Sequence, residues 1–547
     1  MTVLPTDALM QRAQSQPEST AFIFGEDAWT YRRLAEESER VAQGLAANGV
    51  KAGDRVVLHM MNRPEMLVAY YGCFRMGAIA APLRTAFTWA ELAPMLQRVR
   101  PALYIGEAAL YPNVAPVDAT ILPREKRFLV DDTDRTHAVQ AWDALKQAPH
   151  SNLPTPASHQ PAVLINTSGS TGEPKFIIHT LDTVAAITES VHKHFGLPAE
   201  DVIVSPLQLA HGTGFFFSLL FVQFGLPFIM LQTGNPDIVL DCIERYRSTW
   251  MVGFPYQYVG LLEAQQAKPR DVSSLRLCLT GGDLCPVDLQ NRVTSALGAP
   301  LHNIWGSTEG SGQLTFGLRP GPLLRIAEQE QVRIVDENGA DVARGEVGEL
   351  LIGGPNVFVG YWDDPVATAQ SLKDGWYYTG DLVRRGESDE LWFVSRKKNI
   401  IIRGGTNISP AEVEDALVAC HPAVEEAVAV GKPDPVLGQR VFGFVKLAAG
   451  AKQGVVAEIL KNVAARLAPY KVPEGLRVIG ALPRNALSKV DRKALEKMAG
   501  EDESTESLAK AEPLSKVEPL SKEAPLPERA PARAGREQPA RRVAQKR

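Results

Sequence analysis

Cysteine is scarce in this sequence, and the few cysteines form no cluster. The 547 residues include five, Cys73, Cys242, Cys278, Cys285 and Cys420, which are widely scattered and nowhere in CxxC spacing. An odd number without such spacing argues against a disulfide framework and against a cysteine-ligated zinc site. We therefore expect a reducing compartment, with a cytoplasmic location as the default.

A strong excess of charge of either sign is also missing. The net charge is only −5, with 22% charged and 45% hydrophobic residues. This is the composition of an ordinary soluble globular protein, and it gives no indication of nucleic-acid binding. The length is sufficient for two or three domains with sizeable cores.

Long hydrophobic runs and a leader sequence are absent as well. The first 16 residues have neither a basic start nor an apolar core, as a signal peptide would. The most apolar run, Phe215 to Leu231, is interrupted by Gln223, Gly225 and Pro227. We expect it to form a buried helix followed by a short strand, and we expect no transmembrane segment.

Helix and strand patterns alternate through the first 395 residues. Thr30 is a helix cap, Arg55 to Met60 reads as a buried strand, Pro64 to Met76 as a helix, and Ala78 to Leu83 as the next strand. This order predicts a large α/β unit with parallel sheets covered by helices. Its ligands should collect at the carboxyl ends of the strands.

The last 150 residues divide into two parts. Ser409 caps a helix that begins with Pro410, and strand patterns at 427–430 and 441–446 complete a small α+β domain. Residues 501–547 contain no aromatic residue, six prolines and a basic end. Such a tail cannot bury enough apolar surface to fold alone. It is either a solubilising tail or a docking arm for an acidic partner.

A segment rich in glycine and hydroxyl groups follows the apolar run at 162–165. Glycines let a polyphosphate approach the backbone, hydroxyls donate hydrogen bonds and a lysine adds positive charge, so we expect a nucleoside triphosphate here. The P-loop pattern fails, because Glu173 and Pro174 separate the last glycine from the lysine. The expected binding residues are Thr167, Ser168, Gly169, Ser170, Thr171, Gly172 and Lys175.

This segment resembles the [ST]SG[ST]TGxPK signature of the adenylate-forming superfamily, which includes acyl-CoA synthetases, adenylation domains of peptide synthetases, and luciferases. Four later segments resemble further family motifs in the family's order: 303–309, 375–381, 395–414 and 483–492. The resemblance covers about residues 10–500. It implies a large ATP- and acyl-binding domain at 1–395, a hinge at 396–399, a mobile lid domain at 400–500 and a tail at 501–547.

The segment at 303–309 supplies nucleotide and metal ligands by this resemblance. Trp305 would stack on adenine, Thr308 would bond the α-phosphate, and Glu309 would hold Mg²⁺, a role suited to a hard carboxylate oxygen. Tyrosine is commoner than tryptophan at 305, so the stacking surface should remain and a hydroxyl should be lost. Gly281, Gly306 and Ser307 complete the expected nucleotide site.

The resemblance assigns further residues from the next two motifs. Asp381 and Arg396 would hold the ribose, Lys398 would be the hinge, and Gly404 with Gly405 would line the passage for the pantetheine arm of CoA. Serine and asparagine stand beside the hinge at 395 and 399, where the family usually has other residues. Its position is therefore better specified than its flexibility.

Lys489 is the adenylation lysine by resemblance, and His211 is the residue that gates the acyl site. The Phe-Asp pattern with which peptide-synthetase domains bind an amino group is missing, so an amino acid substrate is disfavoured. Small and apolar residues around 212–216 and 253–254 suit an aromatic or a medium aliphatic acid, and the sequence does not choose between them.

Together these features predict an acid–thiol ligase that uses ATP, Mg²⁺ and CoA. A carboxylic acid and ATP would give an acyl-adenylate, which the thiol of CoA then attacks. An alternative is an acyl-AMP ligase that loads the phosphopantetheine of a carrier protein. A different class would be a non-catalytic nucleotide-binding scaffold. The sequence leaves open whether the chain forms a homodimer.

Overall fold

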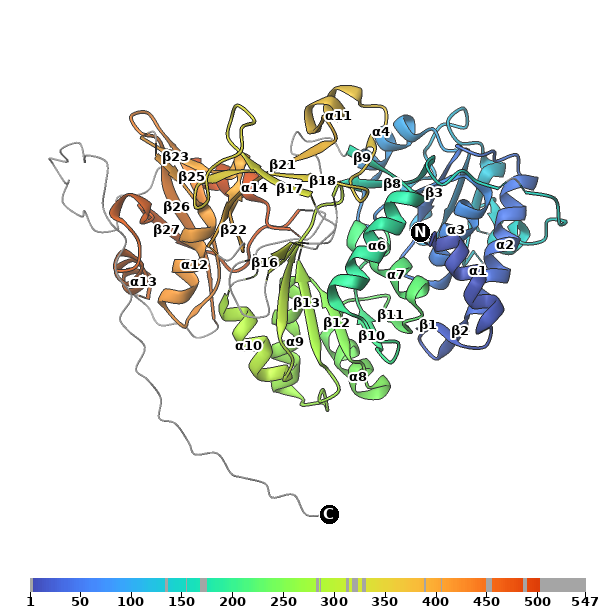
Figure 1. Ribbon diagram of the computed structural model, residues 1–547, viewed down its shortest axis with the longest axis horizontal. Coiled ribbons are helices and arrows are strands. Elements are labelled where there is room, and N and C mark those ends of the chain that lie inside the picture. Colours follow the sequence, from blue (N-terminus) through green and yellow to red (C-terminus); the bar gives the residue numbers. More distant parts are fainter. Residues whose placement is uncertain are drawn as a thin grey trace, which may run out of the picture. The chain divides into compact units, whose positions relative to one another are not determined.

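Figure 1 shows the computed structural model of the chain. Residues 1–503 form one compact unit. The structure describes residues 3–132, 136–153, 155–167, 175–281, 285, 287–310, 314–316, 323–326, 331–387, 390–404, 406–448, 455–485 and 489–501.

An eight-stranded sheet is built mainly from the first third of the chain. Its strand order is β19-β9-β8-β4-β3-β5-β6-β7, and the strands from β8 to β7 in this order run parallel. The strands are β3 (Arg55–His59), β4 (Ile79–Pro82), β5 (Leu103–Gly106), β6 (Arg127–Leu129), β7 (Gln140–Ala141), β8 (Pro161–Thr167), β9 (Lys175–Thr180) and β19 (Gly360–Tyr361). The predicted strands at 55–60 and 78–83 are therefore confirmed.

A fourteen-stranded sheet combines a parallel half and an antiparallel half. The order is β17-β18-β21-β22-β16-β15-β14-β13-β12-β10-β11-β1-β2, with β20 beside β21. Its parallel strands are β1 (Thr20–Phe24), β10 (Ile203–Ser205), β11 (Phe228–Met230), β12 (Trp250–Gly253), β13 (Leu277–Gly281) and β14 (Leu301–Trp305). Its antiparallel strands are β2 (Asp27–Thr30), β15 (Leu314–Phe316), β16 (Leu323–Ile326), β17 (Gln331–Val335), β18 (Val347–Gly353), β20 (Leu372–Lys373), β21 (Trp376–Arg385) and β22 (Leu391–Arg396).

Helices cover both faces of these two sheets. The elements between the sheets are α2 (Tyr31–Ala47), α3 (Pro64–Met76), α6 (Leu181–Phe195) and α7 (Gly212–Phe224), which share one core with both of them. The outer face of the larger sheet packs on α8 (Pro236–Tyr246), α9 (Pro255–Ala267) and α10 (Val287–Leu297), and α4 (Trp89–Val99) packs on the outer face of the smaller one. The remaining elements here are α1 (Pro5–Ser15), α5 (Trp142–Leu145), α11 (Pro365–Ser371), η1 (Tyr111–Asn113) and η2 (Arg124–Lys126).

Local signals explain several of these boundaries. The Thr30 hydroxyl accepts a hydrogen bond from the amide of Arg33 at 3.2 Å and starts α2. Helix α7 ends at Gly225, which has φ +76°, and β11 follows, as the interrupted run at 215–231 predicted. Within the part of the chain that the structure describes, no helix combines the length and hydropathy needed to cross a bilayer.

A five-stranded sheet forms after residue 400. Its order is β24-β23-β26-β25, with β27 beside β26. The elements are β23 (Ile401–Arg403), β24 (Thr406–Ile408), α12 (Pro410–Cys420), β25 (Val424–Asp434), β26 (Gly438–Leu447), α13 (Val455–Ala464), η4 (Pro469–Lys471), β27 (Gly475–Val478) and α14 (Arg492–Gly500). The Ser409 hydroxyl accepts from the amide of Glu412 at 3.3 Å and caps α12, as expected. The fold class is thus a large α/β part with parallel sheets and a small α+β part.

The chain passes from the larger sheet to the five-stranded sheet at one short turn. Strand β22 still pairs with β21, and β23 already belongs to the next sheet. Between them lies η3 (Lys397–Asn399), which coincides with the predicted hinge. That these two parts are separate mobile domains stays a prediction.

Candidate functional site

The site forms where parallel strands of the larger sheet end side by side. Strands β12, β13 and β14 run parallel in register, and Gly281 pairs with Ile304 next to the end of β14. A Cβ atom on Gly281 would lie 2.7 Å from the carbonyl oxygen of Ile304, so only glycine fits there. The segments that follow these strands carry Phe254 and the motif that contains Glu309. Gly281 and the motif that contains Glu309 therefore lie at the carboxyl edge of these strands.

The segment expected to bind phosphate lies between two antiparallel strands. Thr167 at the end of β8 pairs with Lys175 at the start of β9. The Lys175 ammonium lies 4.7 Å from the centroid of the Tyr361 ring. Ser168, Gly169, Ser170, Thr171 and Gly172 lie outside the described residues, so their contribution stays a prediction.

Tyr361 connects Lys175 to Glu309. Its hydroxyl donates a hydrogen bond to Glu309 Oε1 at 3.0 Å, and the amide of Phe358 donates to the Glu309 carbonyl at 2.7 Å. Burial, followed by the negative charge of Glu309, raises the pKa of Tyr361, so the phenol remains a donor. Sequence reasoning assigned no site role to Tyr361. Its strand β19 pairs with β9, a contact between segments about 180 residues apart, as the pair Tyr361 and Ile177 shows.

The Glu309 carboxylate fits the magnesium site expected from the sequence. Mg²⁺ in nucleotide-binding proteins is usually held by one or two carboxylates together with substrate phosphates. In the described part of the chain, no three His, Cys, Asp or Glu side chains form a complete metal cluster. Glu309 is half-buried, with one oxygen oriented by Tyr361. A single carboxylate fits a cation that is held jointly with a nucleotide, and this role of Glu309 stays a prediction.

His179 holds the backbone beside Thr308. Its Nε2 lies 2.7 Å from the Thr308 carbonyl oxygen and its Nδ1 lies 3.0 Å from Thr183 Oγ1. Burial lowers the pKa of His179 to about 4, so the ring is neutral and Nε2–H is the donor to the carbonyl. A Cβ atom on Gly212 would lie 2.9 Å from Thr308 Oγ1, and glycine thus lets the start of α7 approach this turn. No sequence motif indicated a role for His179.

Asp381 receives contacts from two predicted site residues. The Trp305 indole Nε1–H donates to Asp381 Oδ2 at 2.8 Å, and Arg396 Nε lies 2.8 Å from Oδ1 in an ion pair. Oδ1 is buried, and apart from its ion pair with Arg396 it has no hydrogen-bond partner among the described residues. A ribose hydroxyl could donate to it. Tryptophan at 305 was expected to stack and to lose a hydroxyl. The structure adds that its indole supplies a donor to the expected ribose ligand.

Burial raises the pKa of Asp381, and the cations Arg396, Lys489 and Lys398 and the bond from Trp305 oppose this rise. Both Asp381 and Trp305 are nearly inaccessible, with 2% and 8% exposure. The carboxylate is thus fixed in place before a ligand arrives. This preorganisation suits a group that accepts hydroxyl hydrogen bonds.

His211 caps α7 and faces Phe254. Its Nδ1 accepts from the amide of Thr213 at 3.2 Å, and its ring lies edge-on to the Phe254 ring at 5.3 Å between centroids. Burial, followed by the charges of Arg84 and Lys489, holds the pKa of His211 well below its usual value. The ring is therefore neutral, with its proton on Nε2.

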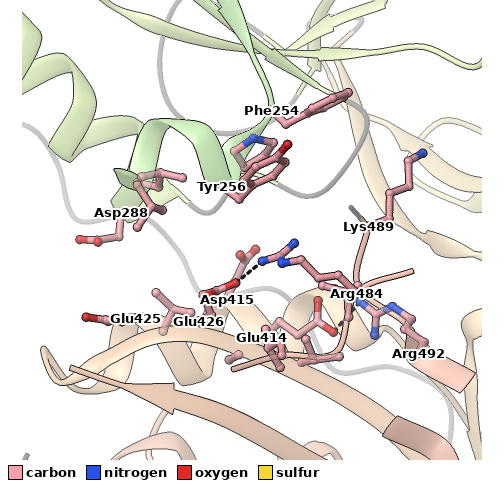
Figure 2. A pocket seen from close by; sticks show the side chains of 18 of the residues that line it. Phe254, Tyr256, Asp288, Glu414, Asp415, Glu425, Glu426, Arg484, Lys489 and Arg492 are labelled. Carbon is pink, nitrogen blue, oxygen red and sulfur yellow. Dashed lines mark hydrogen bonds and ion pairs between the residues drawn. The ribbon is translucent and has the colours of Figure 1, made fainter. Parts of the chain in front are cut away.

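Lys489 lies at the end of a closed turn. The Asn485 amide donates to the Lys489 carbonyl at 2.8 Å, and Arg484 and Val490 form an antiparallel bridge. Figure 2 shows Lys489 and Phe254 lining one pocket. The positive charge of Lys489 lowers the pKa of both His211 and Asp381.

The same pocket shows how the Lys489 turn is held. Arg484 pairs with Glu426 at 2.5 Å, and its guanidinium lies 5.6 Å from the centroid of the Tyr256 ring. Arg492 pairs with Glu414 at 2.7 Å (Figure 2). Tyr256 belongs to α9 of the large part, so the Arg484 contact joins the segment around Lys489 to that part.

The residues expected at the hinge and the CoA passage lie beyond β22. Lys398 is exposed in η3. Gly404 has φ +56° in the turn between β23 and β24, and its amide donates to the Leu437 carbonyl at 2.7 Å. Gly405 lies outside the described residues. Nothing in the geometry tests the roles of these three residues, which stay predictions.

Two protein-family models match the chain. One is described as AMP-binding enzyme and spans residues 9–362, and the other, AMP-binding enzyme C-terminal domain, spans residues 412–489. The medium-chain fatty-acid–CoA ligase of Escherichia coli (strain K12) is 32% identical over 514 residues, which cover 90% of this chain and 89% of that protein. The indoleacetate–CoA ligase of Aromatoleum aromaticum is 33% identical over 496 residues, covering 88% of this chain and 95% of that protein.

Solved structures of CoA ligases have the same fold as this chain. The o-succinylbenzoate CoA synthetase of Bacillus subtilis, in complex with its acyl-adenylate, has a TM-score of 0.77 and 28% identity, covering 89% of this chain and 97% of that one. The anthranilate CoA ligase AuaEII in complex with anthranoyl-AMP has a TM-score of 0.85 at 23% identity, covering 91% and 98%, and shows the likeness of fold alone. The chain belongs to the AMP-binding enzyme family, within the adenylate-forming superfamily, and it is an acid–thiol ligase of the AMP-forming type.

Proposed function

We propose that the protein is an ATP-dependent carboxylate–CoA ligase that acts through an acyl-adenylate on an aromatic or medium aliphatic acid. The observation that carries this proposal is the buried Asp381 carboxylate, which Trp305 and Arg396 contact and whose buried Oδ1 is suited to accept from a ribose hydroxyl. The relatives named above act on a medium-chain fatty acid and on indoleacetate. This range supports both acid classes.

In the first step, a carboxylate oxygen attacks the α-phosphorus of ATP, and the bond to the leaving pyrophosphate breaks. Two negatively charged groups must approach, and each favourable charge pair at about 4 Å is worth about 4 kcal/mol at an effective dielectric constant of 20. Lys489 offsets this repulsion and orients the carboxylate. Magnesium, when bound by Glu309 and the phosphates, supplies further positive charge.

The neutral ring of His211 contributes a hydrogen-bond donor to the acyl site. Since Nδ1 accepts from Thr213, the Nε2–H is the side available to a carboxylate oxygen. Asp381 and Arg396 hold the ribose, and Trp305 orients Asp381 while it lies beside the adenine. These contacts fix the nucleotide so that the carboxylate meets phosphorus in line.

In the second step, the CoA sulfur attacks the acyl carbon and AMP leaves. For this step, Lys489 must leave the acyl site so that the CoA thiol can reach the acyl carbon. The small part of the chain turns about Lys398 for this purpose and brings Gly404 toward the passage for the pantetheine arm. No disulfide joins the five cysteines, all of which lie in the described residues, and this suits a reducing compartment such as the cytoplasm.

Pyrophosphate release tests this proposal. The enzyme is assayed with ATP, Mg²⁺ and a panel of aromatic and straight-chain acids, with and without CoA. We expect sustained release only with CoA, together with a thioester product. Slow release that CoA does not change would favour a carrier-protein thiol. No release with any acid would overturn the ligase proposal.

A further inference from the structure

Three arginines are more than nine-tenths buried within the described residues, and two of them have ordinary partners. Arg127, 1% exposed, donates to the carbonyls of Ala115, Val117 and Leu122 and to the Tyr111 hydroxyl. Arg270, 7% exposed, pairs with two aspartates at 2.6 and 2.9 Å. Both guanidinium groups are satisfied by the fold itself.

Arg84 is different. It is 4% exposed, its Nε has no hydrogen-bond partner, and no ion pair between Arg84 and a carboxylate is found among the described residues. Its Nε is completely enclosed. Burial lowers the pKa of Arg84 to about 10, so the group is still a cation at neutral pH. A buried cation without an anion is costly, and such groups in native proteins require an explanation.

The position of Arg84 links it to the acyl site. Arg84 follows β4. Strand β4 pairs with β8, the strand that leads into the expected phosphate-binding segment. Burial is the largest cause of the lowered pKa of His211, and the positive charge of Arg84 is the second largest. The amino end of the 13-residue helix α7, capped by His211, adds partial positive charge at the same place.

The charges of the reaction do not account for this additional cation. Lys489 already faces the reacting carboxylate, and that carboxylate loses its charge when the adenylate forms. The phosphate of the adenylate keeps one negative charge, and Lys175 can balance it after Lys489 has moved away. Arg84 would then remain unbalanced through the second step. An anion that persists through both steps would match it.

We propose that Arg84 is a specificity-determining residue that binds a second carboxylate on the acid, so that the enzyme prefers dicarboxylic acids. This inference rests on the proposed ligase function and specifies its substrate class. The guanidinium can form two parallel hydrogen bonds to a carboxylate, a geometry that lysine does not reproduce. The apolar residues at Phe254 and along α7 would contact the carbon skeleton between the two carboxylates.

The test compares acids that share a skeleton and differ by one carboxylate. Straight-chain monoacids are paired with α,ω-diacids of equal length, and phenylpropionate with its ring-carboxylated analogue, with initial rates of pyrophosphate release in the presence of CoA. We expect the wild type to favour the diacid, and Arg84→Met to lower the ratio of diacid to monoacid kcat/KM about 10²-fold, mainly through KM. Arg84→Lys should restore part of this ratio.

Controls separate this role from a structural one. Arg75→Met removes the ion pair between Arg75 on α3 and Glu39 on α2, and it should leave the diacid to monoacid ratio as in the wild type. ATP affinity measured by calorimetry without acid should be the same for Arg84→Met and the wild type. Weaker ATP binding, or an equal loss for monoacids and diacids, would place Arg84 at the nucleotide or the reacting carboxylate and overturn the inference.

The outcomes also separate this inference from the ligase proposal. If the wild type releases pyrophosphate only with monoacids, the ligase proposal stands and the role of Arg84 is wrong. If no acid of any class supports release, the ligase proposal itself fails. A preference for diacids that Arg84→Met does not change would show that another residue reads the second carboxylate.

Discussion

The eight-stranded sheet contains two buried arginines that differ in one respect. Arg127 begins β6, at the amino end of a parallel strand, and its guanidinium is enclosed by three carbonyls and a hydroxyl. Arg84 follows the carboxyl end of β4, and within the described residues its guanidinium has no such partner. The fold itself satisfies the guanidinium of Arg127. Arg84 lies after the carboxyl end of a parallel strand, the side of such a sheet where ligands usually bind.

The comparison first predicts opposite effects on stability. Arg127→Met leaves several buried acceptors unpaired, and it should lower the free energy of unfolding by about 3–5 kcal/mol. Arg84→Met removes an unpaired buried cation, so the same quantity should stay constant or rise. Urea unfolding followed by tryptophan fluorescence measures both. Equal destabilisation by the two variants would show that Arg84 and Arg127 do not differ in how the fold satisfies them.

Lys489 should show the reverse pattern, with a large effect on rate and a small one on stability. We expect Lys489→Ala to lower adenylation at least about 10²-fold, the scale of losing one preorganised charge. Its side chain is half-buried in a turn held by backbone bonds, so unfolding should change little. Lys497→Ala, an exposed change on α14, is the control. Nearly intact pyrophosphate release in Lys489→Ala would refute the assignment.

Trp305 should affect both nucleotide affinity and stability. Trp305→Phe keeps an aromatic ring and removes the donor to the buried Asp381 carboxylate. Since a hydrogen bond to a charged group contributes about 1.5–3 kcal/mol, AMP affinity should fall about 10-fold or more. Calorimetric titration with AMP measures this, and the melting temperature should fall as well. Unchanged AMP affinity would show that the indole N–H does not orient the ribose ligand.

A smaller effect is expected from Tyr361. Tyr361→Phe removes one hydrogen bond to Glu309 and keeps the ring that lies near Lys175. We expect the Mg²⁺ concentration for half-maximal rate to rise several-fold, in line with about 1 kcal/mol for one such bond. Tyr246→Phe loses a surface hydrogen bond to Gly25 and is the matched control. A change in kcat with no change in Mg²⁺ dependence would contradict this role.

The mildest effect concerns pH. Burial lowers the pKa of His59 and His179 to about 4, below the ordinary value of 6.5. As the pH falls through 6.5 the unfolded chain takes up protons first, so their contribution is complete above about pH 6.5 and is lost as the pH falls toward 4. His59→Gln should flatten the decline of the melting temperature in this window. An unchanged slope would mean that His59 is not buried in neutral form.

The sequence by itself determined the elements whose signals are local. Thr30 and Ser409 specify helix starts through their own hydroxyls, and Gly225 specifies a helix end through its positive φ. The superfamily was recognisable because its motifs are short and occur in a fixed order. Residues such as Lys489 and Asp381 could be named from these motifs alone.

Tertiary structure decided which distant residues support these motifs. Tyr361 reaches Glu309 across 52 positions and His179 reaches Thr308 across 129, and no local pattern encodes such pairs. The indole bond from Trp305 to Asp381 spans 76 positions. Arg84 has no motif at all, and its significance depends on the absence of a partner among the described residues. Whether a buried group is satisfied depends on the packing around it, and packing is a property of the folded chain.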